Sequence, residues 1–331
     1  MPLTKIAFAP GIDKQDTEYG AAGRWVDSDF VRFRYGLPEK IGGWIKLITN
    51  TLVGVARDMH AWTDLNGVRY TAIGTDRKLY IYTEGVAYDI TPTRATGSIT
   101  GFTTTNNSPT VTVTDPSHGA EVGDFVTISS TSGAVNGIPA ATMDAEYEIL
   151  TVPTGNTYTI TAAANATSTG ASAATATATY QISVGTAVSQ YGYGWGTWQW
   201  GKEAWGTARS TSNVTIEGRN WSFDNFGEDL LATVSNGGTF RWDTSVGVGT
   251  PAAIVTAAPS VSRFNLVSMP DRHVFLFGTE TTIGSSTSKD DLFLRFSSQE
   301  DYNTWTPTAT NTAGSFRIQD GSKIVTAVRS R

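Results

Sequence analysis

Apolar and polar residues alternate with period two along much of the chain, and this pattern predicts β-strands. Residues 110–114 (TVTVT), 125–129 (FVTIS) and 157–161 (TYTIT) are clear examples. In such a strand the apolar side chains all lie on one face, where they can be buried. Runs of Ala, Leu, Glu and Lys that would favour helices are absent. We therefore expect an all-β protein.

The central part of the chain predicts a separate small domain, which we call the insert. Its strands are expected at residues 110–114, 125–129, 146–152, 157–161 and 175–182. The turn residues at 153–156 (PTGN) join two of these strands in a hairpin. Short strands at this spacing indicate a β-sandwich or small barrel over residues 95–184.

The rest of the chain contains a weak repeat of short strands separated by turns. Three sets are expected: 60–62, 68–74, 78–82 and 86–90; then 220–222, 229–234, 239–242 and 252–255; then 264–267, 273–277 and 292–296, with a loop at 279–290. Four-stranded units of this size are typical of β-propeller blades. Each blade packs one face against its neighbour, so the end blades of an open row need cover from elsewhere.

At least four blades usually close a propeller ring, and only three are visible here. Residues 324–328 (IVTAV) predict the start of one more inner strand. We therefore expect β-propeller-like blades in an incomplete ring, either a natural fragment or one completed by another chain; an open stack of sheets is the alternative. The predicted domains are 1–94 (N-terminal segment and first blade), 95–184 (insert) and 185–331 (further blades).

Composition excludes several classes of protein. The 331 residues include no Cys, which rules out disulfide scaffolds, thiol nucleophiles and iron–sulfur clusters. We also expect no secretory signal, because residues 1–10 lack a long apolar run. No stretch of about 18 apolar residues occurs, so we expect no membrane-spanning helix. The net charge of −6 argues against a broad DNA-gripping face. The stretch from 95 to 201 has no Lys or Arg and carries six acids: Asp115, Glu121, Asp124, Asp144, Glu146 and Glu148.

Signals of catalysis are poor. The three histidines, His60, His118 and His273, lie far apart, and none has a second His at ligand spacing. There is no nucleophile elbow, P-loop or dinucleotide fingerprint. We therefore expect no enzyme, no catalytic residue, no cofactor and no bound metal.

The alternating acids of the insert are the one candidate for cation binding. Asp144, Glu146 and Glu148 would lie on one strand face, where carboxylate oxygens can hold calcium. No turn between them supplies carbonyl ligands, so a solvated acidic face is the preferred interpretation. Its acidity also suggests that the insert projects outward.

Two segments hold candidate interface residues. The basic side chains Arg32, Arg34 and Lys40 can form a rim that contacts an acidic partner or DNA phosphate; the preferred alternative pairs them with nearby acids. Residues 191–201 (YGYGWGTWQWG) alternate aromatic residues with Gly and can stack bases. Without a cation in this segment, packing or an interface is favoured. The candidates from the aromatic side are Trp44, Tyr193, Trp195 and Trp198.

Residues 23–44 (GRWVDSDFVRFRYGLPEKIGGW) resemble the opening of tail nozzle proteins of short-tailed bacteriophages, also called packaged-DNA stabilisation or head-completion proteins. Residues 221–232 (WSFDNFGEDLLA) and 305–315 (WTPTATNTAGS) agree with this resemblance. Members of the family are generally longer, so the chain is similar to their N-terminal half. Residues 298–305 (SQEDYNTW) loosely resemble the Asp-box turn of sialidase-like propellers, which is structural even in those enzymes.

The resemblance implies a structural virion protein in a phage tail, assembled in the host cytoplasm. It implies a homo-oligomer, a hexameric ring, below the portal and adaptor proteins, with tail needle, fibre or spike proteins as further partners. Such a ring retains packaged double-stranded DNA and lets it pass at ejection. A glycan- or receptor-binding propeller, an adhesin or sialidase-like protein with an accessory sandwich, is the alternative function.

Overall fold

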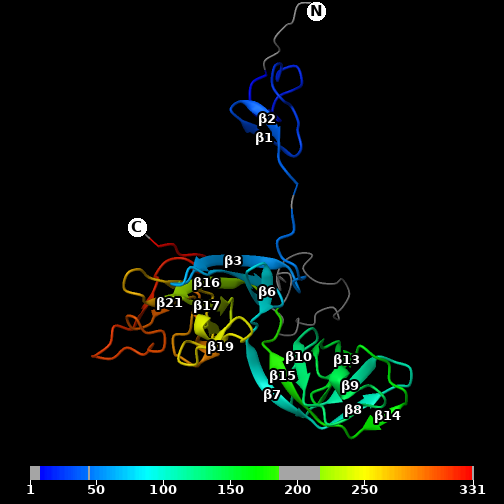
Figure 1. The fold of residues 1–331 in the computed structure, drawn as a ribbon. Helices are drawn as coiled ribbons and strands as arrows, with labels where there is room; N and C mark the ends of the chain where they lie inside the picture. Colours follow the sequence, from blue (N-terminus) through cyan, green and yellow to red (C-terminus); the bar gives the residue numbers. More distant parts are fainter. Residues whose placement is uncertain (1–7, 44, 186–216, 330–331) are drawn as a thin grey trace, which may run out of the picture. The chain divides into compact units, whose positions relative to one another are not determined.

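The computed structural model describes residues 8–43, 45–185 and 217–329, and it confirms an all-β chain (Figure 1). The chain divides into two compact units, residues 1–47 and residues 48–331. The N-terminal segment and the first blade, which we predicted as one region, thus belong to different units. Helical structure in the described residues is limited to α1 (Ala140–Met143) and two 3-10 turns, Thr244–Val246 and Ser286–Ser288.

The N-terminal unit contains one antiparallel hairpin, β1 (Val31–Arg34) paired with β2 (Leu37–Lys40). Tyr35 and Gly36 form its tip, and both adopt positive φ, 51° and 79°. Paired positive φ values are the signature of a tight hairpin turn whose twist matches the strands. Pro38 lies in β2, which is an edge strand, where Pro is tolerated.

Three four-stranded antiparallel sheets form the blades of the second unit, each a meander with its strands in chain order. Blade 1 comprises β3 (Ala56–Thr63), β4 (Arg69–Thr75), β5 (Leu79–Thr83) and β6 (Val86–Asp89). Blade 2 comprises β16 (Trp221–Phe226), β17 (Asp229–Val234), β18 (Thr239–Trp242) and β19 (Ala253–Ile254). Blade 3 comprises β20 (Phe264–Val267), β21 (Val274–Phe277), β22 (Phe293–Phe296) and β23 (Gly314–Arg317).

The insert is a β-sandwich with a core of its own. One sheet has the order β11-β10-β15-β7 and the other β12-β13-β9-β8-β14. The strands are β7 (Thr93–Ile99), β8 (Gly101–Thr104), β9 (Thr110–Thr114), β10 (Phe125–Ser129), β11 (Glu146–Glu148), β12 (Thr151–Thr154), β13 (Thr157–Thr161), β14 (Gly170–Ser172) and β15 (Ala176–Gln181). Both sheets bury one face against the other, as the alternating pattern predicted.

The blades pack face to face, and β16 contacts both β3 and β20. Figure 1 shows β3 and β16 side by side. Adjacent residues of β17 point into different cores, because successive side chains of a strand face opposite ways. Leu230 packs with Leu79 and Trp242 between blades 1 and 2. Leu231 packs with Leu276 between blades 2 and 3. Blade 2 is therefore buried on both faces.

The outer faces of the end blades are covered in part by short segments of the same chain. Ile48 and Leu52 pack on the outer face of blade 1. Ile324 is buried on the outer face of blade 3 beside Phe277. The strand expected at 324–328 is not formed: the Ile324 N–H donates to the Asp291 carbonyl, but no neighbouring strand is present to pair with this segment.

Replacing a leucine between blades tests the importance of this packing. We expect Leu230→Ala, at a fully buried position, to lower the unfolding free energy by about 3 kcal/mol, through lost burial and the cavity left behind. The matched Leu65→Ala, at a side chain that is 91% exposed, is expected to change it by less than about 0.5 kcal/mol. Urea unfolding of both variants measures the difference; equal losses would contradict the packing described.

Candidate interaction site

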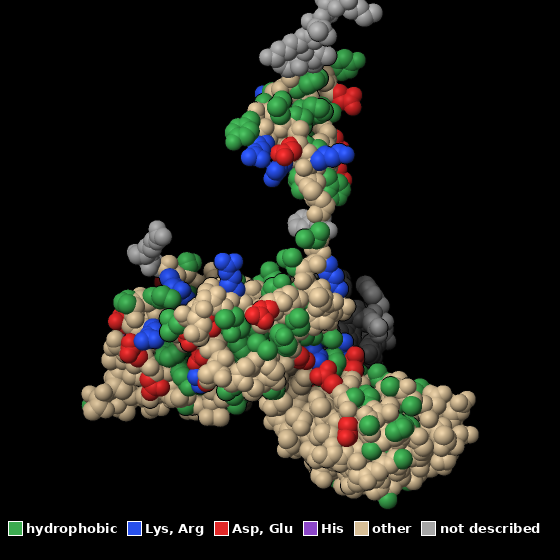
Figure 2. Space-filling model, in the orientation of Figure 1, with side chains coloured by type: hydrophobic (Ala, Val, Ile, Leu, Met, Phe, Trp, Pro, Cys, Tyr) green, Lys and Arg blue, Asp and Glu red, His purple; other side chains and the backbone are tan. Residues whose placement is uncertain are grey.

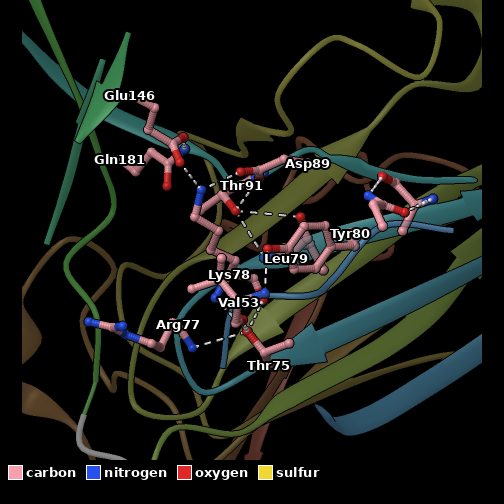
Figure 3. A network of polar contacts seen from close by, with 12 residues as sticks. Val53, Thr75, Arg77, Lys78, Leu79, Tyr80, Asp89, Thr91, Glu146 and Gln181 are labelled. Atoms are coloured by element: carbon pink, nitrogen blue, oxygen red, sulfur yellow. Dashed lines mark hydrogen bonds and ion pairs between the residues drawn. The ribbon is translucent and has the colours of Figure 1, made fainter. Parts of the chain in front are cut away.

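A buried lysine joins the insert to blade 1 (Figure 3). Lys78 immediately precedes β5, and its side chain is only 3% exposed. Its ammonium group lies 2.6 Å from Asp89 Oδ2 of β6 and also forms an ion pair with Glu146 of β11. The Phe125 ring of β10 lies 4.4 Å away and presents its face to the same cation. One lysine thus connects two sheets that belong to different domains.

Neighbouring contacts strengthen this junction. Arg77 forms an ion pair with Glu148, and its guanidinium lies 5.1 Å from the centre of the Phe125 ring. Arg219, which lies just before β16 of blade 2, donates a hydrogen bond to the carbonyl of Ser183, which lies just after β15 of the insert. Burial lowers the pKa of Arg219 to about 10. Arg219 therefore stays cationic at neutral pH despite its burial.

The ion pairs change the picture of the acidic insert. Glu146 and Glu148 face blade 1 and are paired, not free in solvent as we expected, and Asp144 accepts a hydrogen bond from Thr131 Oγ1 at 2.6 Å. Their cations precede them by about 70 residues, so local alternation could not reveal the pairing. The insert surface visible in Figure 2 accordingly carries few charged side chains.

Opposing effects set the pKa of Lys78. Burial lowers it, but the attraction and hydrogen bonds of Asp89 and Glu146 outweigh burial, so the pKa lies above its usual value. A raised lysine pKa means that the charge stabilises the folded state at neutral pH. This contribution is lost only as the pH rises through the raised pKa.

A polar hollow of about 250 Å³ lies beside the junction. It is lined by Asp89, Thr91, Thr93, Thr127, Glu146, Thr179, Gln181 and Pro251. Both carboxylates are already engaged: Asp89 Oδ1 accepts from Thr91, and Glu146 Oε2 accepts from the Gln181 amide at 2.8 Å. The carboxylates that line the hollow therefore serve the contact between blade 1 and the insert.

The predicted basic rim lies on the N-terminal hairpin. Arg32 forms an ion pair with Glu39 at 3.2 Å, which agrees with the self-paired interpretation. Arg34 lies over the ring of Tyr35, 5.4 Å from its centre. Within the described residues Lys40 has no ion pair. The other candidates, Trp44, Tyr193, Trp195 and Trp198, lie outside the described residues.

The three histidines have separate structural partners. His60 contacts the Asn225 side chain, His118 Nδ1 accepts from the Ala120 N–H, and His273 Nδ1 lies 2.8 Å from the Ser297 carbonyl oxygen. No cluster of three or more His, Cys, Asp or Glu suited to a metal occurs in the part of the chain that the structure describes. None of the helices in that part has the length and apolarity that a membrane crossing requires.

The turn that resembles an Asp-box has a packing role. Asp301 accepts from the Asn303 N–H at 2.7 Å, and the Trp305 indole N–H donates to the Tyr302 carbonyl. Trp305 itself is buried between blades 2 and 3. The two hydrogen bonds hold the turn in place, and the Trp305 side chain fills space in the core between the blades.

Comparison with known proteins gives little. No protein-family model matches the sequence, and no curated protein matches it. Among solved structures the chain is similar to one titled "Phage phi92 endosialidase", at 16% sequence identity and a TM-score of 0.23. The match covers 82% of this chain and 37% of that one. A likeness at this TM-score carries no argument about function.

Removing the buried cation tests the junction. We expect Lys78→Met to lower the unfolding free energy by about 2 kcal/mol, because Asp89 and Glu146 lose their counterion in a partly buried setting. Arg272→Met, which breaks the exposed pair with Glu300, is the control and is expected to cost less than about 0.5 kcal/mol. Urea unfolding at neutral pH compares them. If the two losses are equal, Lys78 does not hold the insert.

Proposed function

We propose that this chain is a structural, non-enzymatic protein of a short-tailed phage virion: a tail nozzle subunit. Copies assemble as a ring, six in number, below the portal and adaptor. The ring retains the packaged double-stranded DNA and conducts it at ejection. The sequence resemblance of residues 23–44 to nozzle proteins is the starting point of this proposal.

The observation that carries the proposal is an open row of three blades in which only the middle one is buried on both faces. The end blades have short segments in place of neighbouring sheets. Such a row is the architecture of a part that functions next to other polypeptides.

The charge distribution suits a passage for DNA. The chain has a net charge of −6, and several of its cations already lie beside acids, such as Arg94, 3.6 Å from the buried Asp124. Free cations on a channel wall would bind phosphates and slow the polymer, since each phosphate contact adds affinity. A ring with a net negative charge and paired cations would let DNA slide.

Location in the particle tests the proposal. Antibodies against the insert are expected to label the tail vertex, and a density map of the particle is expected to show this chain six times in a ring below the portal. Location in a fibre or spike, or absence from the particle, would contradict the proposal. Binding or hydrolysis of glycans by the isolated chain would support the alternative function instead.

DNA affinity tests the conduit idea. The assembled chain is expected to bind duplex DNA with a Kd above about 1 µM at moderate salt, because its net charge of −6 repels phosphate. Fluorescence anisotropy with a labelled duplex measures this. Sub-micromolar binding at the same salt would show that the protein grips DNA and would contradict free passage.

A further inference from the structure

The N-terminal unit exposes most of its large apolar side chains, and Trp25, Val31 and Phe33 are half-buried. In its described residues the only buried apolar side chain is that of Ala21. The exposed ones are Phe8, Ile12, Tyr19, Val26, Phe30, Tyr35, Leu37, Ile41, Ile45 and Leu47. A unit of fewer than 50 residues without a core cannot offset its chain entropy alone. It must be completed by a partner.

The unit also separates its unpaired charges along the chain. Three ion pairs are local: Lys14–Asp27, Arg24–Asp13 and Arg32–Glu39. Among the described residues, those left without an ion pair fall into two groups. Residues 13–29, which we call the acidic loop, keep Asp16, Glu18 and Asp29; residues 31–46, the basic hairpin, keep Arg34, Lys40 and Lys46. The acidic loop therefore has three acids without an ion pair, and the basic hairpin has three bases without one.

The two halves also differ in shape. The tip of the basic hairpin presents Tyr35, which is 91% exposed, next to the exposed Leu37. A hollow of about 660 Å³ opens at the start of the acidic loop, lined by residues 10–15 and Arg24. Tyr19, 95% exposed, and Phe30 add apolar surface to the acidic half. One half thus carries a projecting aromatic side chain and the other a concave site.

We propose that the N-terminal unit binds head to tail to the N-terminal unit of a second copy of this chain. The basic hairpin of one copy packs against the acidic loop of the next, and Tyr35 enters the hollow there. This inference deepens the proposed function and rests on it for the ring. A heterologous contact of this kind closes into a ring when the rotation between copies fits.

Charge argues for a second copy over other partners. The unit holds both members of a complementary pair in equal number, so its own copy satisfies every unpaired charge at once. Duplex DNA would satisfy Arg34 and Lys40 but would be repelled by Glu18 and Asp29. An exclusively acidic or basic protein surface would likewise match only half of the unit.

Charge reversal in the full chain tests the proposal. The loop variant carries Glu18→Lys and Asp29→Lys, and the hairpin variant carries Arg34→Glu and Lys40→Glu. All four positions are exposed, so folding is expected to be unchanged. Each variant alone brings like charges together and is expected to weaken self-association by roughly 100-fold in sedimentation velocity. An equimolar mixture of the two restores opposite charges at every contact and is expected to restore association.

The controls separate this contact from the ring itself. Glu121→Lys with Arg69→Glu reverses exposed charges on the second unit and is expected to leave association unchanged. A monomeric wild-type chain at micromolar concentrations, or a mixture that stays dissociated, would overturn the proposal. If the chain forms a ring in virions while both variants still associate, the head-to-tail contact is wrong and the nozzle function stands. If association follows the charges but the chain is absent from virions, the nozzle function is wrong instead.

Discussion

Burial of apolar side chains between neighbouring four-stranded sheets is the interaction on which this protein depends. Blade 2 shows the principle: Leu230 and Leu231, adjacent on β17, contribute to two different cores. A sheet that must bury both faces needs a sheet on either side. In an open row of such sheets, each end blade has one face without a neighbouring sheet. Short segments around Ile48 and Ile324 cover part of these two faces.

Electrostatics performs a second, separate task. The insert has its own core and is fastened to blade 1 through Lys78 and Arg77, which take up Glu146 and Glu148. Two of the six acids of the insert are thereby paired inside the protein. In the N-terminal unit the unpaired acids and bases instead remain exposed, together with its apolar residues. The ion pairs that attach the insert to blade 1 lie within the protein, whereas the unpaired charges of the N-terminal unit are exposed where we propose that a second copy binds.

Much of the fold could be predicted from the sequence, because strands buried on one face carry a period-two pattern. The hairpins of blade 1 and of the insert follow this rule. β7, β8 and β23 were missed because they offer little alternation: β23 has Phe316 as its one apolar residue, and that side chain is 58% exposed.

The junction between the insert and blade 1 was missed for another reason. The pairing of Lys78 with Glu146 joins residues far apart in sequence, and local pattern holds no information about it. Residues 324–328 have strand-forming composition, yet composition cannot supply the neighbouring strand that a ladder requires.

With the proposed head-to-tail contact, the N-terminal unit is completed only by assembly. Hydrogen exchange of residues 8–43, compared between the dilute chain and the assembled protein, measures this directly. We expect fast exchange along β1 and β2 in the dilute chain and strong protection after assembly, while Leu230 and its neighbours stay protected in both. Equal, strong protection of the hairpin in the dilute chain would show that the unit is stable by itself and would contradict the claim.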